Sequence, residues 1–481
     1  MDQTRLTRRG FLRKIGTAAG ATAVAAGSAQ AWLGAEESRA HPDTPTGTGA
    51  AKPDLPNIVL ILADDLGYGD LSSYGAKDLR TPNIDALVAG GMSFSRFYAS
   101  CSVCSPTRAA FLTGRYPAMV GVPGVIRTKD NKSWGYLSPS AHTLPELLKP
   151  AGYDTAIVGK WHLGLKSPNL PNDRGFDRFE GFLGDMMQSY YSHRRDGMNF
   201  MRHNGETIDP KGHASDLFTQ WACDYLRGRK AAGHAVRPFF LYLAYNAPHF
   251  PVQPPEDYLA KVLKREPGID KTRALLVALI EHMDDGIGKV VAAIKDSGLA
   301  DNTLVVFTSD NGGDLGCAAD NGPLRSGKGT IYEGGLRVPA CAVWPGHIKP
   351  GSRTDRVALT MDLMLTLLEA AGAKAPDGIE GRSVLPTLLG LPQAPETRYL
   401  FFSLYGGQTT SAVLHDDWKM LRNQPGAPLE LYNLKDDPQE KTDLAAATPR
   451  PKQFDELKAE LDKYVKAAEA VEWRRPSQRK Q

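Results

Sequence analysis

Four short apolar runs, separated by segments of helical periodicity, constrain the fold of this chain more than any other feature. They are rich in Ile, Val, Leu and aromatic residues and occupy residues 58–62, 155–158, 239–245 and 304–308. Continuous runs of this kind are typical of strands that are buried on both faces of a parallel sheet. Between the last two runs, residues 273–295 carry apolar side chains at helical spacing. The pattern predicts an α/β fold in which a large, mostly parallel sheet is sandwiched by helices.

The C-terminal part of the chain has a different pattern of predicted elements, with antiparallel strands in place of buried parallel ones. A chain of 481 residues has room for one large α/β domain and a smaller companion. Further strands and helices are expected at residues 339–344 (strand), 362–371 (helix), 399–405, 410–421 and 429–434 (antiparallel strands), and 454–470 (helix). We therefore expect a large domain over residues 55–395 and a small antiparallel-sheet subdomain with one helix over residues 396–475.

The N-terminal segment has the composition of an export signal. Residues 7–12 (TRRGFL) resemble a twin-arginine motif, an Ala/Gly-rich stretch follows, and residues 28–31 (SAQA) fit a small-residue cleavage site. We expect a twin-arginine signal peptide over residues 1–31 and a disordered lead-in over residues 32–54, which is rich in Pro, Gly, Thr and Ala. The apolar stretch is short for a membrane span, so no stable membrane anchor is expected, although an uncleaved anchor is the alternative.

Charge and cysteine content exclude two classes of protein. The net charge of +3 is too small to favour nucleic-acid binding. Five cysteines in 481 residues do not make a disulfide scaffold. The pairing of Cys101, Cys223, Cys317 and Cys341 cannot be read from the sequence.

Polar side chains follow each of the four apolar runs. They are Asp64 and Asp65, Lys160 and His162, His249, and Asp310 and Asn311. Ligands bind outside the carboxyl ends of strands in open parallel sheets, so we expect one site built from four loops. The carboxylate and amide oxygens among these residues suit Ca²⁺, or Mg²⁺ with added waters. Taken singly, the 310–312 stretch is also an ordinary turn signal, and the 64–65 pair could cap a helix.

The segment that begins at Cys104 carries the most specific signal. Pro106 suits the first turn of a helix and Gly114 its end, which places Cys104 at the positive N-terminal end. Arg108 lies four residues further on and so falls on the same helix face. A cysteine beside a guanidinium at a helix start suits attack on an anion. The alternative is a redox or zinc pair formed by Cys101 and Cys104, but no second pair follows at zinc spacing.

These segments resemble the sulfatase family, of the arylsulfatase type within the alkaline phosphatase superfamily. The Cys-x-Pro-x-Arg pattern at residues 104–108 is similar to the family's maturation signature, in which the cysteine is oxidised to formylglycine. Three further stretches are sulfatase-like: residues 152–162, residues 246–249 and residues 327–337, the last with Lys328. The resemblance extends over residues 57–445. It implies that residues 55–395 are the catalytic sulfatase domain, and that the chain is a hydrolase acting on sulfuric esters.

The resemblance also implies a role for each residue. A divalent cation, Ca²⁺ or Mg²⁺, would be held by Asp64, Asp65, Asp310, Asn311 and the modified Cys104. The hydrated aldehyde at position 104 would attack sulfur, with Arg108 stabilising charge and Lys160, Lys328 and His249 contacting the sulfate. His249 or Lys328 would protonate the leaving alcohol, and His162 would take the proton that lets sulfate depart. The residue that completes the sulfate pocket stays open among Asp185, Gln188 and Ser189.

The expected substrate is a sulfate monoester of a carbohydrate or an aryl alcohol. A basic loop over residues 190–204 either contacts a polyanionic sugar chain or is simply solvated; it contains His193, Arg194, Arg195, Arg202 and His203. A formylglycine-generating enzyme and the twin-arginine translocase are the expected protein partners, and the location is periplasmic or secreted. Two alternatives remain: hydrolysis of phosphonate monoesters or phosphodiesters on the same fold, and non-catalytic binding of sulfated glycans.

Overall fold

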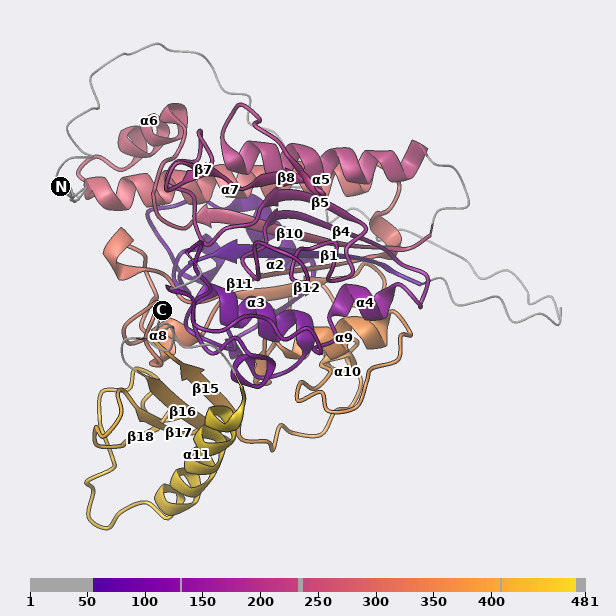
Figure 1. Ribbon diagram of the computed structural model, residues 1–481. Helices are drawn as coiled ribbons and strands as arrows, with labels where there is room; N and C mark the ends of the chain where they lie inside the picture. Colours follow the sequence, from indigo (N-terminus) through magenta and orange to yellow (C-terminus); the bar gives the residue numbers. More distant parts are fainter. Residues whose placement is uncertain (1–54, 130–131, 232–236, 407–408, 473–481) are drawn as a thin grey trace, which may run out of the picture. The chain divides into compact units, whose positions relative to one another are not determined.

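A ten-stranded mixed sheet forms the centre of the part of the chain that the structure describes (Figure 1). The structure is a computed structural model and describes residues 55–129, 132–231, 237–406 and 409–472. Five neighbouring strands in the middle of the sheet run parallel. They are, in spatial order, β11 (Thr303–Ser309), β1 (Asn57–Asp64), β10 (Phe239–Pro248), β4 (Asp154–Lys160) and β5 (Arg178–Phe182). The four apolar runs are the cores of β1, β4, β10 and β11, so the expected parallel sheet is confirmed.

Antiparallel strands close both sides of this parallel core. On one side β12 pairs antiparallel with β11 and with β2, and β13 completes the edge; on the other, β8 and β9 follow β5. These edge strands are short: β12 (Ala340–Val343), β2 (Met92–Phe94), β13 (Ser352–Thr354), β8 (Met201–His203) and β9 (Glu206–Thr207). The expected strand at 339–344 is β12, and its direction makes the sheet mixed rather than purely parallel.

Helices cover both faces of the sheet, which is why its central strands are apolar throughout. All ten residues of β10 are buried, as are the last seven of β1. One face carries α2 (Pro82–Gly90), α5 (Ala214–Ala231), α6 (Glu256–Arg265) and α7 (Lys271–Asp296). The opposite face carries α3 (Cys104–Thr113), α4 (Leu144–Leu148), α9 (Asp362–Ala370) and α10 (Leu385–Leu388) (Figure 1). The helices expected over 273–295 and 362–371 are α7 and α9.

The C-terminal residues form a separate antiparallel sheet with one helix. The strands pair in sequence order. The elements are β15 (Leu400–Leu404), β16 (Thr410–His415), β17 (Trp418–Arg422), β18 (Glu430–Asn433) and α11 (Gln453–Ala470). One apolar cluster joins this sheet to α11 through Val413, Met420 and Leu461. The expected antiparallel-sheet subdomain with a closing helix is therefore found, and its sheet has four strands, while a domain boundary at residue 395 stays a prediction.

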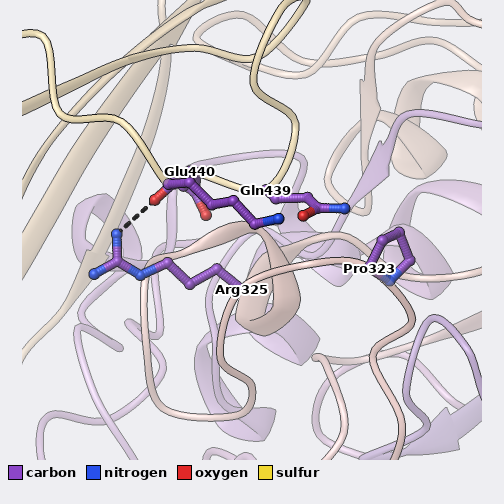
Figure 2. Close-up of a pocket in the computed structure, with 5 residues that line it drawn as sticks. Pro323, Arg325, Gln439 and Glu440 are labelled. Carbon is purple, nitrogen blue, oxygen red and sulfur yellow. Dashed lines mark hydrogen bonds between the residues drawn. The ribbon is translucent and has the colours of Figure 1, made fainter.

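A buried charge cluster and an arginine join the C-terminal sheet to the main body. Lys419 of β17 is fully buried, and its Nζ lies 2.8 Å from Glu333 Oε1 and 2.9 Å from Glu440 Oε1. Arg325 Nη1 donates to the Glu440 carbonyl at 2.7 Å beside a pocket of about 410 Å³ (Figure 2). Pro323, Arg325 and residues 439–441 line this pocket, and none of the polar strand-end residues does.

Several expectations concern residues outside the described ranges. The signal peptide over residues 1–31, the lead-in over residues 32–54 and the last residues of the C-terminal subdomain all lie there. Within the described ranges, no helix has the length and apolar character that crossing a membrane requires. All five cysteines lie within those ranges, and each is a buried free thiol, so Cys101 and Cys104 are not a disulfide pair.

Candidate active site

Helix α3 begins at Cys104 and ends before Gly114, as the sequence predicts. The Thr107 hydroxyl donates to the Cys101 carbonyl at 2.8 Å and accepts from the Cys101 N–H at 3.1 Å, which fixes the turn that leads into the helix. Gly114 has φ 63°, and its N–H closes the helix on the Ala110 carbonyl at 2.8 Å. This left-handed conformation favours glycine. Every residue of α3 is buried, so Cys104 sits at a helix start inside the molecule.

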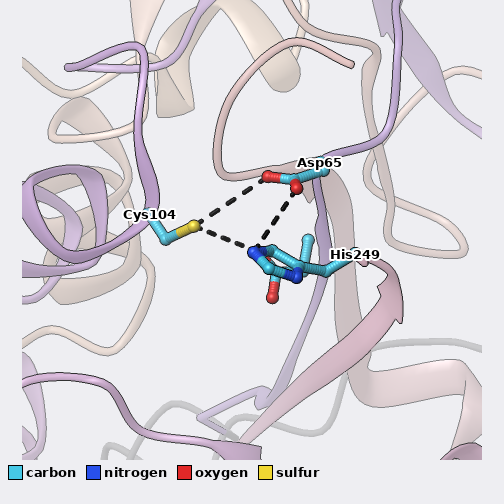
Figure 3. A group of neighbouring side chains, drawn as sticks. Asp65, Cys104 and His249 are labelled. Atoms are coloured by element: carbon cyan, nitrogen blue, oxygen red, sulfur yellow. Dashed lines mark hydrogen bonds and ion pairs between the residues drawn. The ribbon is translucent and has the colours of Figure 1, made fainter. Parts of the chain in front are cut away.

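Cys104 faces the carboxylates that follow β1. Its Sγ donates to Asp64 Oδ1 at 3.2 Å and lies 3.9 Å from Asp65 Oδ1. Potential ligand atoms of Asp64, Asp65, Cys104 and His249 all lie within 4.8 Å of one another. Figure 3 shows Cys104, Asp65 and His249 converging from three separate segments. The predicted meeting of the strand ends is therefore found.

Three cations neutralise this cluster. Lys160 Nζ lies 2.5 Å from Asp64 Oδ2, and Lys328 Nζ lies 2.5 Å from Asp65 Oδ2. The guanidinium of Arg108 donates twice to Asp310 Oδ2, at 2.8 and 3.0 Å, and approaches Asp64 Oδ1 at 3.7 Å. The side chains of Arg108, Lys160, Asp64 and Asp310 are fully buried.

The charges in this cluster balance without any bound ion, since three carboxylates face three cations. Burial would raise the pKa of Asp65, but Lys328 and His249 outweigh it and hold that pKa well below its usual range. Burial and the neighbouring Asp64 raise the pKa of Asp310 to about 6. Burial and Asp64 also raise the pKa of the Cys104 thiol well above its usual value. An unmodified Cys104 is therefore a poor nucleophile here, because it stays a thiol.

The donor set fits a hard divalent cation. Asn311 Nδ2 donates to Asp65 Oδ1 at 2.8 Å, whereas Asn311 Oδ1 is buried and has no hydrogen-bond partner among the described residues. A buried carbonyl oxygen without a partner costs free energy unless it binds something. Together with Asp64, Asp65 and Asp310 it offers the oxygen ligands that Ca²⁺ and Mg²⁺ prefer. One carboxylate oxygen of Asp310, Oδ1, already accepts a hydrogen bond from the Asp65 N–H at 3.2 Å.

The two predicted histidines lie at the site in defined orientations. His162 is buried, and its Nε2 is bonded to the Ile126 carbonyl at 2.8 Å, which leaves Nδ1 without a partner among the described residues. Burial and the cation of Lys160 lower the pKa of His162 well below its usual value. His249 Nδ1 is bonded to the Phe250 carbonyl at 2.6 Å, and Nε2 lies 3.6 Å from Asp65 Oδ2. Burial and Lys328 lower the pKa of His249 to about 3, so the imidazole is neutral near pH 7.

Backbone geometry marks two of these residues as well. Asp65 has φ 68° and His162 has φ 61°, both in the left-handed region that non-glycine residues avoid. Such conformations cluster at functional sites, where surrounding contacts hold them in place. Only glycine fits at position 312, directly after Asn311, because a Cβ there would lie 1.9 Å from the Gly334 carbonyl oxygen. The loops after β1, β4 and β11 are thus packed tightly around the cluster.

The residues left open near the sulfate pocket have other partners. The Asp185 carboxylate is buried and lies 3.3 Å from Arg195 Nε and 3.6 Å from Arg127 Nη1. Gln188 bonds through its side chain to Asp196. The Ser189 hydroxyl accepts from the two N–H groups of residues 191 and 192. No hydrogen bond or ion pair described here joins any of the three to the Cys104 cluster, and the choice among them stays open.

The basic loop over residues 190–204 is mostly committed to the fold. Arg194 pairs with Asp209 at 3.0 Å, and Arg202 donates to the carbonyls of Asn199 and Met201. His203 bonds to Glu180 at 2.8 Å, and His193 to the Gly212 carbonyl at 3.1 Å. Of the five basic residues, Arg195 lines a pocket. Neither interpretation from the sequence, contact with a polyanionic sugar chain or simple solvation, describes the whole loop.

A second cluster of potential ligands lies between α5 and α7. His213, Asp216 and His282 place ligand atoms within 4.8 Å of one another. Both ring nitrogens of His213 are already engaged, with the Gln253 carbonyl at 3.0 Å and the Ser215 N–H at 3.2 Å, and His282 Nε2 bonds to Asp216 at 2.8 Å. These bonds tie the two helices to the segment that follows β10.

Comparison with known proteins decides the family. The family model described as Sulfatase matches residues 56–373, which include every residue of the Cys104 cluster. The chain belongs to the sulfatase family. A second family model, described as N-sulphoglucosamine sulphohydrolase, C-terminal, matches residues 326–468 and includes the C-terminal sheet of this sulfatase.

Individual relatives agree with this assignment. Human arylsulfatase A is 36% identical over 485 residues, covering 87% of this chain and 90% of that protein. Rat N-acetylgalactosamine-6-sulfatase is 38% identical over 362 residues, covering 71% of this chain and 67% of that protein. The crystal structure of Ps i-CgsB in complex with k-i-k-neocarrahexaose is similar, with 34% identity, a TM-score of 0.78 and coverage of 85% of this chain and 93% of that one. The protein is therefore a sulfatase enzyme, a hydrolase of sulfate esters.

Proposed function

We propose that this sulfatase releases inorganic sulfate from a sulfated carbohydrate, using a formylglycine made from Cys104 and a bound divalent cation. The observation that carries the proposal is the convergence of Cys104 with three carboxylates and three cations at buried strand ends. Because burial raises the pKa of the thiol, an unmodified Cys104 would stay protonated at neutral pH, which favours a modified residue 104 over a thiolate as the nucleophile.

Asp64, Asp65, Asp310, Asn311 and the modified residue 104 would hold the cation. When bound, a divalent ion supplies positive charge that stabilises the sulfate oxygens. Ca²⁺ is favoured over Mg²⁺ because oxygen ligands from several loops suit a larger, more flexible coordination shell. The site is neutral without the ion, so binding leaves a surplus of two positive charges that attracts an anionic ester.

The side chains around residue 104 bind and orient the ester. A hydrated aldehyde at position 104 supplies the hydroxyl nucleophile. Lys160, Lys328 and Arg108, which pair with the carboxylates of the cluster, would face the sulfate oxygens. Preorganised cations in a water-poor site are the largest expected source of rate enhancement. Because they are fixed by buried carboxylates, they need little rearrangement when charge develops.

The hydrogen bonds of the His162 and His249 rings indicate which nitrogen atom of each could accept or donate a proton. His162 Nε2 is held by the Ile126 carbonyl, so in the neutral ring Nδ1 is the acceptor that would take the proton from residue 104. The leaving alcohol would receive its proton from Lys328 Nζ or from His249 Nε2, both of which lie near Asp65 Oδ2. Because the neutral His249 ring carries its hydrogen on Nδ1, which donates to the Phe250 carbonyl, Nε2 can serve as the acid only after the ring has taken up a proton. To find which residue protonates the alcohol, esters with good and poor leaving groups can be compared in His249→Ala and Lys328→Ala proteins. Loss of the acid should slow esters with poor leaving groups more than those with good ones.

A sulfated sugar is the favoured substrate class. Rat N-acetylgalactosamine-6-sulfatase is named for an amino-sugar sulfate, and the Ps i-CgsB structure holds a neocarrahexaose. An aryl sulfate is the simplest alternative ester, as the name of human arylsulfatase A indicates. We also propose that the chain is matured by a formylglycine-generating enzyme and exported by the twin-arginine translocase to the periplasm or beyond, on the strength of residues 7–12 and 28–31.

A desulfation screen tests the proposal. Protein made together with a maturation enzyme is incubated with Ca²⁺ and a panel of sulfated mono- and oligosaccharides, 4-nitrophenyl sulfate and a phenyl phosphonate ester. Sulfate release from a sugar ester that is lost in Cys104→Ala supports the proposal. Faster cleavage of the phosphonate than of every sulfate would favour the phosphonate-hydrolase alternative. Tight glycan binding without any turnover would favour a binding protein.

A further inference from the structure

A charged pocket lies beside the two segments that bond to His162 and is not used by the chemistry described above. It has a volume of about 400 Å³. Two separate segments contribute its charged lining: Arg127, Lys129 and Lys132 from one, and Asp185, Arg195 and Asp196 from the other. Four of these side chains are cations and two are carboxylates, so the lining has a surplus of two positive charges.

Both segments are anchored to the same catalytic histidine. The His162 ring bonds to the Ile126 carbonyl at 2.8 Å, and the His162 N–H donates to the Leu183 carbonyl at 3.3 Å. The Ile126 N–H also donates at 3.1 Å to the hydroxyl of Ser105, the residue after the nucleophile position. Arg127 follows directly, and Asp185 comes two residues after Leu183. The pocket therefore begins one residue after Ile126 and two residues after Leu183, both of which bond to His162.

The ion pairs inside the pocket are looser than those of the Cys104 cluster. Arg127 and Arg195 lie 3.6 and 3.3 Å from Asp185, and Lys129 lies 3.3 Å from Asp196. In the cluster, the lysine–aspartate distances are 2.5 Å. Side chains of Arg127 and Lys129 are about half exposed, at 45% and 54%. The Lys129–Asp196 pair is exposed and contributes little to stability, so an incoming anion can replace it at small cost, whereas the buried Asp185 keeps its arginines.

We propose that this pocket is a subsite for a second anionic group, a sulfate or a carboxylate, on the sugar chain that carries the scissile ester. Planar guanidinium groups suit either anion, and the two lysines add mobile charge at the exposed side. The buried Asp185 holds the two arginines in place and sets the charge that the pocket offers. The subsite makes multiply charged glycans the substrate class of this sulfatase. The inference rests on the proposed sulfatase function.

Competition against 4-nitrophenyl sulfate turnover tests the subsite, with matured protein and Ca²⁺. The competitors are a κ-carrageenan tetraose, which has sulfates and no carboxylate, a hyaluronan tetrasaccharide, which has carboxylates and no sulfate, and a neutral agarose-derived tetraose. Lys129→Gln/Lys132→Gln is the first variant, because both side chains are exposed and their loss leaves Asp185 paired. Arg127→Gln/Arg195→Gln is the second. Lys458→Gln/Lys463→Gln on α11 removes the same charge from residues that do not line the pocket.

At least one charged tetrasaccharide should inhibit the wild type, and the neutral one should not. The inhibition constant of that competitor should rise about tenfold or more in both pocket variants and stay within about twofold in the α11 control. The competitor that inhibits identifies the anion as sulfate or carboxylate. Absence of inhibition by both charged sugars, or equal constants in pocket and control variants, would overturn the inference. Wild-type protein that fails to cleave any sulfate ester would instead refute the proposed function.

Discussion

Removing the buried ammonium of Lys419 should destabilise the protein strongly. Lys419, Glu333 and Glu440 are all fully buried, and the lysine Nζ contacts both carboxylates at 2.8 and 2.9 Å. Lys419→Met leaves two carboxylates in the same buried site without their shared cation. Loss of one partner from a buried ion pair typically costs about 3–5 kcal/mol.

The remaining contacts place the expected loss in the lower half of that range. Glu333 keeps a hydrogen bond from the Tyr98 hydroxyl at 2.8 Å, and Glu440 keeps one from the Glu333 N–H at 2.7 Å. Glu440 can also take up a proton, because burial already raises its pKa even with Lys419 beside it. We therefore expect a decrease of about 3 kcal/mol in the free energy of unfolding at pH 7.

Urea unfolding followed by tryptophan fluorescence measures this difference. Lys463→Met on α11, 77% exposed, is the matched control and should change the free energy of unfolding by less than about 0.5 kcal/mol. Lys419→Met/Glu440→Gln should recover part of the loss, since it removes one of the stranded charges. The deficit should shrink as the pH falls, because a protonated carboxyl no longer needs the ammonium. A loss below about 1 kcal/mol in Lys419→Met would refute the reasoning.

Three further predictions concern the site and its surroundings. Arg108→Lys should lower kcat about 10²–10³-fold, because the fork of bonds to Asp310 is lost while the charge is kept; a decrease of less than tenfold would contradict the role of Arg108. Chelation of the metal should abolish turnover, and added Ca²⁺ should restore it. Full activity in demonstrably metal-free protein would show that no cation takes part in the reaction. Asn311→Leu should weaken Ca²⁺ binding measured by calorimetry. Burial and the neighbouring His282 lower the pKa of His213 to about 4 from an ordinary value of 6.5. Between these two pH values the unfolded chain binds a proton at His213 that the folded protein does not. The free energy of unfolding should therefore fall as the pH drops from 6.5 to 4. His213→Gln should show a smaller decrease over that window, and an unchanged acid slope would show that His213 is not the cause.

The centre of the fold could be predicted because burial on both faces leaves a direct mark on the sequence. Strands β1, β4, β10 and β11 are covered by helices, so their side chains are apolar without alternation. The short strands β2, β13, β8 and β9 could not be predicted in the same way. β8 and β9 are two or three residues long and partly exposed, and their pairing depends on the strand beside them rather than on their own composition.

The strand-end residues could be located for a related reason. Once the strands are placed, the topology of a parallel sheet brings their carboxyl ends to one edge, and residues such as Asp64 and Asp310 follow directly. The subsite pocket was missed because neither of its segments has a periodic pattern. A cluster of three basic residues at 127–132 was the available signal, but its meaning depends on Asp185 and Arg195 from a distant loop. Lys419 likewise reads as a solvent-facing position of a strand, and only tertiary packing shows that it is buried.

The mass of the tryptic peptide that spans residues 97–108 tests the central claim most directly. Protein made together with a maturation enzyme, and shown to release sulfate from its ester, is digested and treated with an aldehyde-specific hydrazide. The account predicts that position 104 carries an aldehyde and that the hydrazide adduct forms in proportion to activity. An active preparation in which that peptide keeps an unoxidised thiol throughout would contradict it.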